Sequence, residues 1–199
     1  MKIFRWTLVP ALCLLATSFC LGQSVDAFFG FNGLFSGQNA ALAANGVTKL
    51  GGGFYPSVGG DLIFLPHNLG ISAQVAWRGS LMNYGGYGLR PIFYDFNLAW
   101  EPVAPGSTIR PDFNVGIGAE SLRLYTGQYT CNFLSGCTNY SSNNHFMQHV
   151  GVGVKIYVTQ HIFLRPAVDY YHIDNNAEFG INSVWQAGIG VGYTLGPSS

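Results

Sequence analysis

The fold is decided by the stretch Leu69-Gly-Ile-Ser-Ala-Gln-Val-Ala-Trp77, in which every odd position is apolar and the even positions hold Gly, Ser, Gln and Ala. The stretches 92–100, 150–158 and 185–195 repeat this period of two. Successive side chains of a β-strand point to opposite faces, so strict alternation predicts strands with two chemically different faces. The sequence is therefore that of an all-β protein.

The alternating pattern occurs in eight segments along the chain, at residues 25–36, 52–65, 69–79, 90–101, 109–125, 145–158, 161–173 and 183–195. The connections between them alternate in length. Long polar connections cover 37–51, 80–89, 126–144 and 174–182, and short ones cover 66–68, 102–108 and 159–160. In an antiparallel barrel all four long connections then lie at one end, as is typical of outer-membrane barrels.

The N-terminal segment has the layout of a secretory signal peptide. Lys2 and Arg5 precede an apolar run from Leu8 to Leu21, and small residues follow at 22–24. The run is shorter than the ~20 apolar residues that a transmembrane helix needs. We therefore predict a signal peptide at residues 1–23, cleaved near Gly22 or Gln23, and one barrel domain at residues 24–199.

The composition excludes several classes of protein. Charged residues make up 9% of the chain, against about a quarter in soluble globular proteins. Without the predicted signal peptide the chain has seven basic and nine acidic residues, a formal net charge of −2, so no basic patch predicts binding to nucleic acid. No later apolar run approaches the length of a membrane-spanning helix.

The sizes of the two faces indicate which one points outward. The apolar face is crowded with Phe, Tyr, Trp and Ile, and the interior of eight strands only just accommodates side chains. The opposite face is small, with Gly151, Gly153, Gly188, Gly190, Gly192, Gly116, Gly118, Ser72, Asn97 and Asn114. We therefore predict an eight-stranded antiparallel up-and-down transmembrane β-barrel with its apolar face outward. The alternative is a soluble, lipocalin-like binding barrel with the faces exchanged.

Most of the few charged residues occupy the same alternate positions of the strands as the small residues, and so belong to the same face. A lipid-facing Arg or Lys near the midplane costs about 2–4 kcal/mol, so we predict that they form a network in the lumen. The predicted network has four acidic and four basic members: Asp61, Arg78, Arg90, Asp95, Glu120, Lys155, Arg165 and Asp169. Structural packing is the favoured role of this network, and a gated ion path is the alternative.

Three residues conflict with the regular pattern. Pro56 and Pro166 lie inside predicted strands although proline cannot donate to a ladder, so we expect bulges or unpaired carbonyls there. Arg123 has the outward parity of its segment. We therefore expect that strand to slip or to end near Ser121.

Cys131 and Cys137 lie in the longest predicted loop, and an exported chain meets an oxidising compartment, so we predict a disulfide between them. His145 and His149 are four residues apart, which on a strand separates them by about 13 Å. Joint metal coordination then fails, and we interpret both as polar residues of the rim or lumen. No metal or cofactor is predicted.

The terminal segment Gly188-Ile-Gly-Val-Gly-Tyr-Thr-Leu195 is similar to the segment by which the barrel-assembly machinery recognises its clients, although it lacks a terminal Phe. With the signal peptide and the eight segments, it makes the chain resemble small outer-membrane barrels of the OmpA/OmpX type. That resemblance implies a bacterial outer-membrane location, contact with membrane lipid and lipopolysaccharide, and insertion by that machinery.

One segment raises the question of an enzyme. Residues 171–176 are similar to the His-x-Ser-Asn stretch of outer-membrane lipid A deacylases, but Asp174 occupies the serine position, so the nucleophile is missing. We therefore predict a non-enzymatic protein with a structural or surface-interaction role through four extracellular loops. The alternatives are a narrow ion channel, a lipid A-modifying enzyme and the soluble binding barrel.

Overall fold

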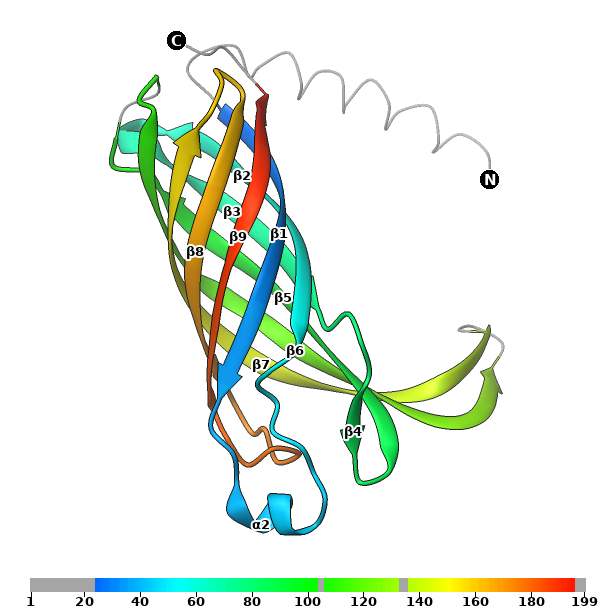
Figure 1. The fold of residues 1–199 in the computed structure, drawn as a ribbon. Coiled ribbons are helices and arrows are strands. Elements are labelled where there is room, and N and C mark those ends of the chain that lie inside the picture. Colours follow the sequence, from blue (N-terminus) through cyan, green and yellow to red (C-terminus); the bar gives the residue numbers. More distant parts are fainter. Residues whose placement is uncertain (1–23, 104–105, 133–135, 196–199) are drawn as a thin grey trace, which may run out of the picture.

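A computed structural model describes residues 24–103, 106–132 and 136–195. One antiparallel sheet closes on itself as a barrel, because β1 pairs with β9 and β3 pairs with β5 (Figure 1). The eight wall strands are β1 (Ser24–Ser36), β2 (Phe54–Leu65), β3 (Leu69–Trp77), β5 (Tyr87–Trp100), β6 (Ile109–Asn132), β7 (Gly136–Tyr157), β8 (Ile162–Ile173) and β9 (Ser183–Leu195). The predicted eight-stranded antiparallel barrel is confirmed. The predicted signal peptide, residues 1–23, lies outside the described residues.

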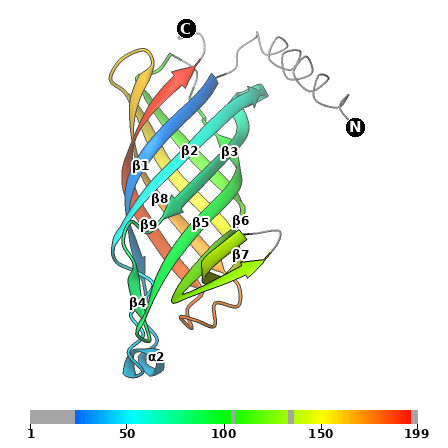
Figure 2. The same ribbon diagram turned by 90° about the vertical axis from the view of Figure 1, so that its right-hand side faces the viewer.

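The two ends of the barrel differ. The turn end holds the start of β1, the end of β9, the 3-10 turn η1 (Pro66–Asn68), the connection 158–161 and the described residues 101–103 and 106–108 of the connection between β5 and β6. The loop end holds the long connections, the short helix α2 (Ala40–Ala44) and the small strand β4 (Met82–Tyr84), which pairs with the start of β5 (Figures 1 and 2). No helix in the described part of the chain is long and apolar enough to cross a membrane.

The outer face of the wall is apolar, as predicted. Alternate residues of β5 and β6 leave Phe96, Leu98, Val115 and Ile117 between 55% and 62% exposed. The inner face is lined by small residues that make room for larger ones: at Gly192 the ring of Phe163 occupies the space that a Cβ would need. Exposed apolar surface on this scale requires a lipid environment, because soluble monomers rarely expose contiguous apolar patches above a few hundred Å².

The apolar core lies inside the barrel, in its loop-end half. Its members come from most of the wall strands and from the loops that close this end. They include Leu34, Leu50, Tyr55, Phe93, Leu122, Met147, Tyr171, Ile173 and Phe179. Most of the buried charges lie instead towards the turn end, where Phe28 and Phe163 pack beside them, so the two halves of the lumen differ in chemistry.

The longest predicted loop, 126–144, is largely strand. β6 and β7 continue past Tyr125 and Tyr140 and pair there only with each other, with Thr130 opposite Thr138 and Cys131 opposite Cys137. A register shift between Tyr125 and Thr130 separates this outer part from the wall. We call residues 126–139 the arm, and it projects away from the barrel (Figure 1).

The expected bulges at Pro56 and Pro166 and the expected slip of β6 are absent, whereas unpaired ladder positions, the other outcome expected at the prolines, do occur at Pro166. The β1–β2 register runs unchanged past Pro56, and the β8–β9 register runs unchanged past Pro166. Pro166 instead lies where the β7–β8 ladder is interrupted, between the pairs Gly153–Ala167 and Ile156–Leu164. β6 neither slips nor ends near Ser121, since Arg123 remains paired with both neighbouring strands. The β7–β8 ladder thus accommodates Pro166, which has no backbone N–H to donate, by leaving the neighbouring positions unpaired.

Candidate functional site: the barrel interior, the loop end and the outer wall

A buried ion cluster occupies the turn end of the lumen. Lys155 on β7 is fully buried, and its Nζ lies 2.5 Å from Asp26 Oδ2, 2.8 Å from Asp61 Oδ2 and 2.5 Å from Glu101 Oε1. The three carboxylates lie close enough together to hold a metal ion. The Lys155 ammonium already occupies the position between them and is the shared counter-ion of all three carboxylates, although Asp26 Oδ1 and Asp61 Oδ1 lack a hydrogen-bond partner among the described residues.

Further towards the loop end, two more polar layers follow. The Arg165 guanidinium binds Asp112 Oδ2 through Nε at 3.0 Å and Nη2 at 2.5 Å, and it lies over the ring of Phe28. His149 then places Nδ1 2.7 Å from Asn97 Oδ1 and Nε2 3.1 Å from Asp169 Oδ1. Both ring nitrogens face side-chain oxygens, so His149 on β7 links β5 to β8 across the lumen.

A stack of rings separates these polar layers from the apolar half. The His149 ring stacks on Tyr171 with centroids 4.9 Å apart, Tyr171 on Phe93 at 5.5 Å, and Phe93 lies 6.0 Å from Tyr55. We call these four residues the ring stack. They come from β7, β8, β5 and β2, and the three carbon rings are fully buried. The stack therefore crosses the lumen at the level where a pore would have to run.

The predicted charge network is only partly inside. Asp61, Asp95, Glu120, Lys155, Arg165 and Asp169 are buried and point inward. Arg78 is half-buried at the loop end of the lumen, 5.9 Å from the ring of Tyr55. The prediction that Arg90 lies in the lumen is wrong. Arg90 lies on the outer face, because the alternation of β5 places Leu89 and Pro91 inward.

Sequence reasoning missed four buried charges: Asp26, Glu101, Arg110 and Asp112. Among the described residues, seven carboxylates and three Lys or Arg side chains are buried inside, and Arg78 is half-buried at the loop end, so the set is not a balanced four and four. Asp26 and Glu101 lie at the ends of their segments, where alternation is weakest. The parity of Asp112 with Asn114 and Gly116 could have revealed it.

Three loops pack against one another and close the loop end. Tyr84 in β4 donates its hydroxyl to Glu178 O at 3.1 Å and packs edge-on against Phe179. Thr48 donates to Asn83 O at 2.6 Å, which ties the connection containing α2 to β4. Partial burial in this contact, together with the Glu178 carboxylate, raises the pKa of Tyr84. These contacts make the three loops a cap.

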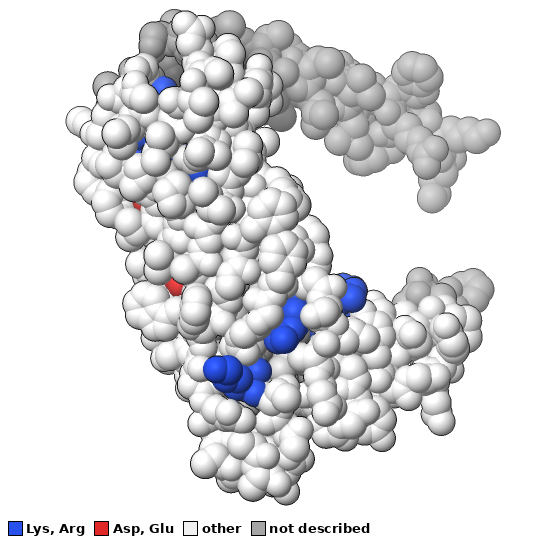
Figure 3. Space-filling model, in the orientation of Figure 1, with Lys and Arg blue, Asp and Glu red and all other residues white. Residues whose placement is uncertain are grey.

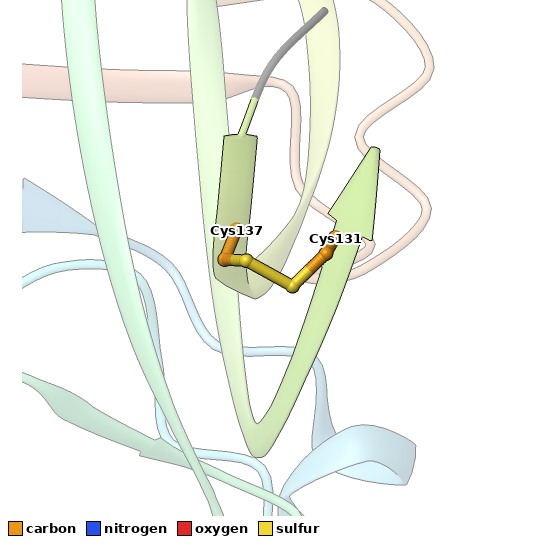
Figure 4. The surroundings of a disulfide bond; sticks show 2 residues. All are labelled: Cys131 and Cys137. Atoms are coloured by element: carbon orange, nitrogen blue, oxygen red, sulfur yellow. A yellow bond between two sulfur atoms is a disulfide. The ribbon is translucent and has the colours of Figure 1, made fainter. Parts of the chain in front are cut away.

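The arm is the fourth long connection, and it stands apart from the cap (Figure 2). The predicted disulfide between Cys131 and Cys137 is present and joins the two strands of the arm (Figure 4). Tyr129 is 74% exposed. Residues 124–144 contain no Asp, Glu, Lys, Arg or His, and they are rich in Tyr, Ser, Asn, Thr and Gly.

The histidines do not form a shared site. His149 belongs to the lumen, whereas His145 contacts Glu178 at 3.0 Å beneath the cap. His172 and Asp174 lie 3.5 Å apart at the loop end, each about two-fifths exposed. In the segment 171–176, the structure therefore shows a side-chain contact between His172 and Asp174 that is accessible from outside the barrel.

No protein-family model and no curated protein sequence matches the chain. Solved structures do. Neisserial surface protein A aligns with 87% of this chain and 96% of its own at 13% identity and a TM-score of 0.55. The N-terminal barrel domain of Pseudomonas aeruginosa OprF covers 87% and 98% at 15% identity and a TM-score of 0.54. Yersinia pestis Ail, solved with the heparin analogue sucrose octasulfate, covers 88% and 100% at 10% identity and a TM-score of 0.56.

The fold is that of a small outer-membrane β-barrel. At such low identities the likeness establishes the fold alone. The outer wall supports a membrane location as well, because a closed barrel pairs the backbone of its wall strands without water and presents an apolar face to lipid. Fold and wall together assign this barrel to a bacterial outer membrane.

Proposed function

We propose that this barrel is a non-enzymatic surface-interaction protein whose arm binds an external partner. The observation that supports the proposal most strongly is the difference between the four long connections at the loop end. Three long connections pack into the cap, whereas the described residues of the arm project away from the barrel and are joined by a disulfide (Figure 1). In barrels of this kind the longer loops face the outside of the cell, which would present the arm to the surroundings.

The composition of the arm supports a binding role. Tyr, Ser, Gly and Asn dominate the binding loops of antibodies, because Tyr offers a large, rigid, amphipathic contact and the others offer adaptable hydrogen bonds. The arm carries the same residue types and no charge. We therefore propose a neutral polar partner, such as an uncharged glycan, rather than the sulfated sugar analogue present in the Ail structure.

The test is to reconstitute the mature barrel in nanodiscs and to measure its binding to an array of uncharged glycans. Replacing residues 127–139 by an Asn-Gly turn is expected to abolish binding while the barrel still folds. Tyr129→Ser should weaken binding, and Tyr87→Ser is the matched control, since Tyr87 is 53% exposed but lies off the arm. Binding that survives removal of the arm would contradict the proposal.

The non-enzymatic part of the proposal rests on Asp174. A carboxylate at this position cannot replace the serine hydroxyl as the nucleophile of acyl transfer. Mass spectrometry of lipid A from cells that express the barrel is expected to show unchanged acyl chains. Loss of an acyl chain that depends on His172 would establish the enzyme instead.

We also propose that the end of β9 guides assembly. Tyr193 and Leu195 point outward and are 46% and 55% exposed, where a recognition surface can read them. The double variant Tyr193→Ala/Leu195→Ala should lower the amount of folded barrel in the outer membrane. The matched control is Val191→Ala on the same face. Equal amounts of both variants would argue against this role.

A further inference from the structure

The outer face of the wall carries two like charges side by side. Arg90 on β5 and Arg123 on β6 are directly opposite each other in the β5–β6 ladder, and both have outward parity. They are the only Lys, Arg, Asp or Glu side chains on the outer face of the eight wall strands within the described ranges. Opposed residues of antiparallel strands have Cβ atoms about 5 Å apart, and like charges there are destabilising.

No carboxylate of the chain compensates the pair. All nine Asp and Glu residues are described; seven are buried inside the barrel. The other two belong to the 174–182 connection, where Asp174 contacts His172 and Glu178 contacts His145. Arg90 Nε is itself buried and lacks a hydrogen-bond partner among the described residues. Any counter-charge for the two guanidiniums must therefore come from outside the chain.

Two tyrosines hold the guanidiniums in place. Arg90 Cζ lies 5.9 Å from the ring centroid of Tyr125, and Arg123 Cζ lies 5.0 Å from that of Tyr140. The two rings pack together with centroids 5.8 Å apart. Cation–π contacts orient an arginine without neutralising it, so its N–H groups remain available to an anion.

The position of the Arg90–Arg123 pair along the barrel axis indicates which kind of anion it meets. Arg90 lies ten positions before Trp100, which is at the turn end of β5. At about 3.3 Å per residue and a strand tilt of about 40°, this is about 25 Å along the barrel axis, the height of the apolar band of outer-membrane barrels. The outward residues in between are Ile92, Tyr94, Phe96 and Leu98. The pair therefore lies at the level of lipid headgroups, on the loop side.

We infer that Arg90 and Arg123 together bind the phosphate of a membrane-lipid headgroup in the leaflet at the loop end. Arginine forks match phosphate oxygens bidentately, and a bridging phosphate turns the repulsion between the two guanidiniums into attraction for a shared anion. Lys49 and Arg78 also lie at the loop end, and the largest basic area on the face shown in Figure 3 gathers there. These exposed charges add only a weak, salt-screened attraction at long range, whereas Arg90 and Arg123 would contact the phosphate itself.

The experiment titrates the folded mature barrel in uncharged detergent with diphosphoryl lipid A and counts bound lipid by native mass spectrometry. The double variant Arg90→Gln/Arg123→Gln is expected to lose at least about tenfold in affinity. The control is Lys49→Gln, which removes an exposed loop-end charge away from the pair and should change affinity by less than about threefold. Heat-modifiable mobility on a cold gel verifies that each variant folds.

Two competitors separate the sources of phosphate. Dephosphorylated lipid A should bind with at least about tenfold lower affinity than the diphosphoryl form, because the anion is missing. Inorganic phosphate at about tenfold excess over the lipid should displace little of it, because it lacks the acyl chains that the apolar wall holds. Equal affinity of the double variant, equal affinity for dephosphorylated lipid, or full displacement by inorganic phosphate would each overturn the inference.

A second readout distinguishes ligand binding from a purely structural role. In uncharged detergent without anionic lipid, Arg90→Gln should raise the midpoint of thermal unfolding, because it removes a repulsion. Addition of diphosphoryl lipid A should reverse this order by stabilising the wild-type barrel more than the variant. A variant that is less stable than the wild type under both conditions would show that Arg90 serves the fold alone.

Discussion

The ring of Phe93 lies nearly parallel to the ring of Tyr171, with centroids 5.5 Å apart and planes inclined by 22°, although the two residues come from strands β5 and β8 that are not neighbours. This contact spans the lumen. It joins the polar layers around His149 to the apolar core beneath the cap, and it places buried aromatic carbon where a water-filled path would have to pass.

The ring stack predicts a closed lumen. The wild-type barrel in planar bilayers should show no steady conductance, whereas Phe93→Ala/Tyr171→Ala should open a small, cation-selective one, because seven carboxylates face three Lys or Arg side chains inside. Phe96→Ala, on the outer face of the same strand, is the control. Steady conductance of the wild type would instead favour the narrow channel.

Removal of the central cation should destabilise the turn end. Lys155→Met leaves Asp26, Asp61 and Glu101 buried without their shared partner, which should lower the free energy of unfolding by about 3–5 kcal/mol. Urea unfolding of the barrel in lipid vesicles measures the change. Lys49→Met at the exposed loop should stay within about 0.5 kcal/mol. Adding Asp61→Asn to Lys155→Met should recover part of the loss, and a neutral Lys155→Met variant would show that the cluster is screened by water.

A charge on the apolar wall tests the membrane face directly. Leu98 is 62% exposed on the outer face of β5, and Leu98→Arg should lower the stability of the barrel in lipid vesicles by about 2–4 kcal/mol. Leu81→Arg is matched in chemistry but lies in the loop end, where Leu81 is 49% exposed, and it should be nearly neutral. A soluble barrel would tolerate both changes equally and would fold in buffer without detergent.

The disulfide should matter to the arm and not to the wall. Replacing Cys131 and Cys137 by Ser frees a short loop, which costs about 2–3 kcal/mol of local stability. Limited proteolysis should then cut within residues 126–139 faster, while the urea midpoint of the barrel stays the same. A parallel loss of barrel stability would mean that the arm is coupled to the wall, contrary to the register shift after Tyr125.

Alternation of side chains was enough to predict the eight wall strands, because the period of two is a local property of each strand. The outward direction of the apolar face needed a second observation, the large size of its side chains against the narrow interior of an eight-stranded barrel. The Cys131–Cys137 disulfide was also predictable, because only a short segment separates the two cysteines. The arm was not, since its Tyr, Ser and Asn residues lack alternating hydrophobicity, and its strands are held by pairing with each other instead.

Which charges meet was decided by the tertiary structure. Parity within one strand says whether a side chain points inward, but the stagger between strands sets which residues share a level of the barrel. That stagger brings Asp26, Asp61 and Glu101 around Lys155 from four different parts of the chain. It likewise sets Arg90, which was predicted to lie in the lumen, opposite Arg123, which conflicted with the pattern of its segment, so the two become one pair on the outer wall.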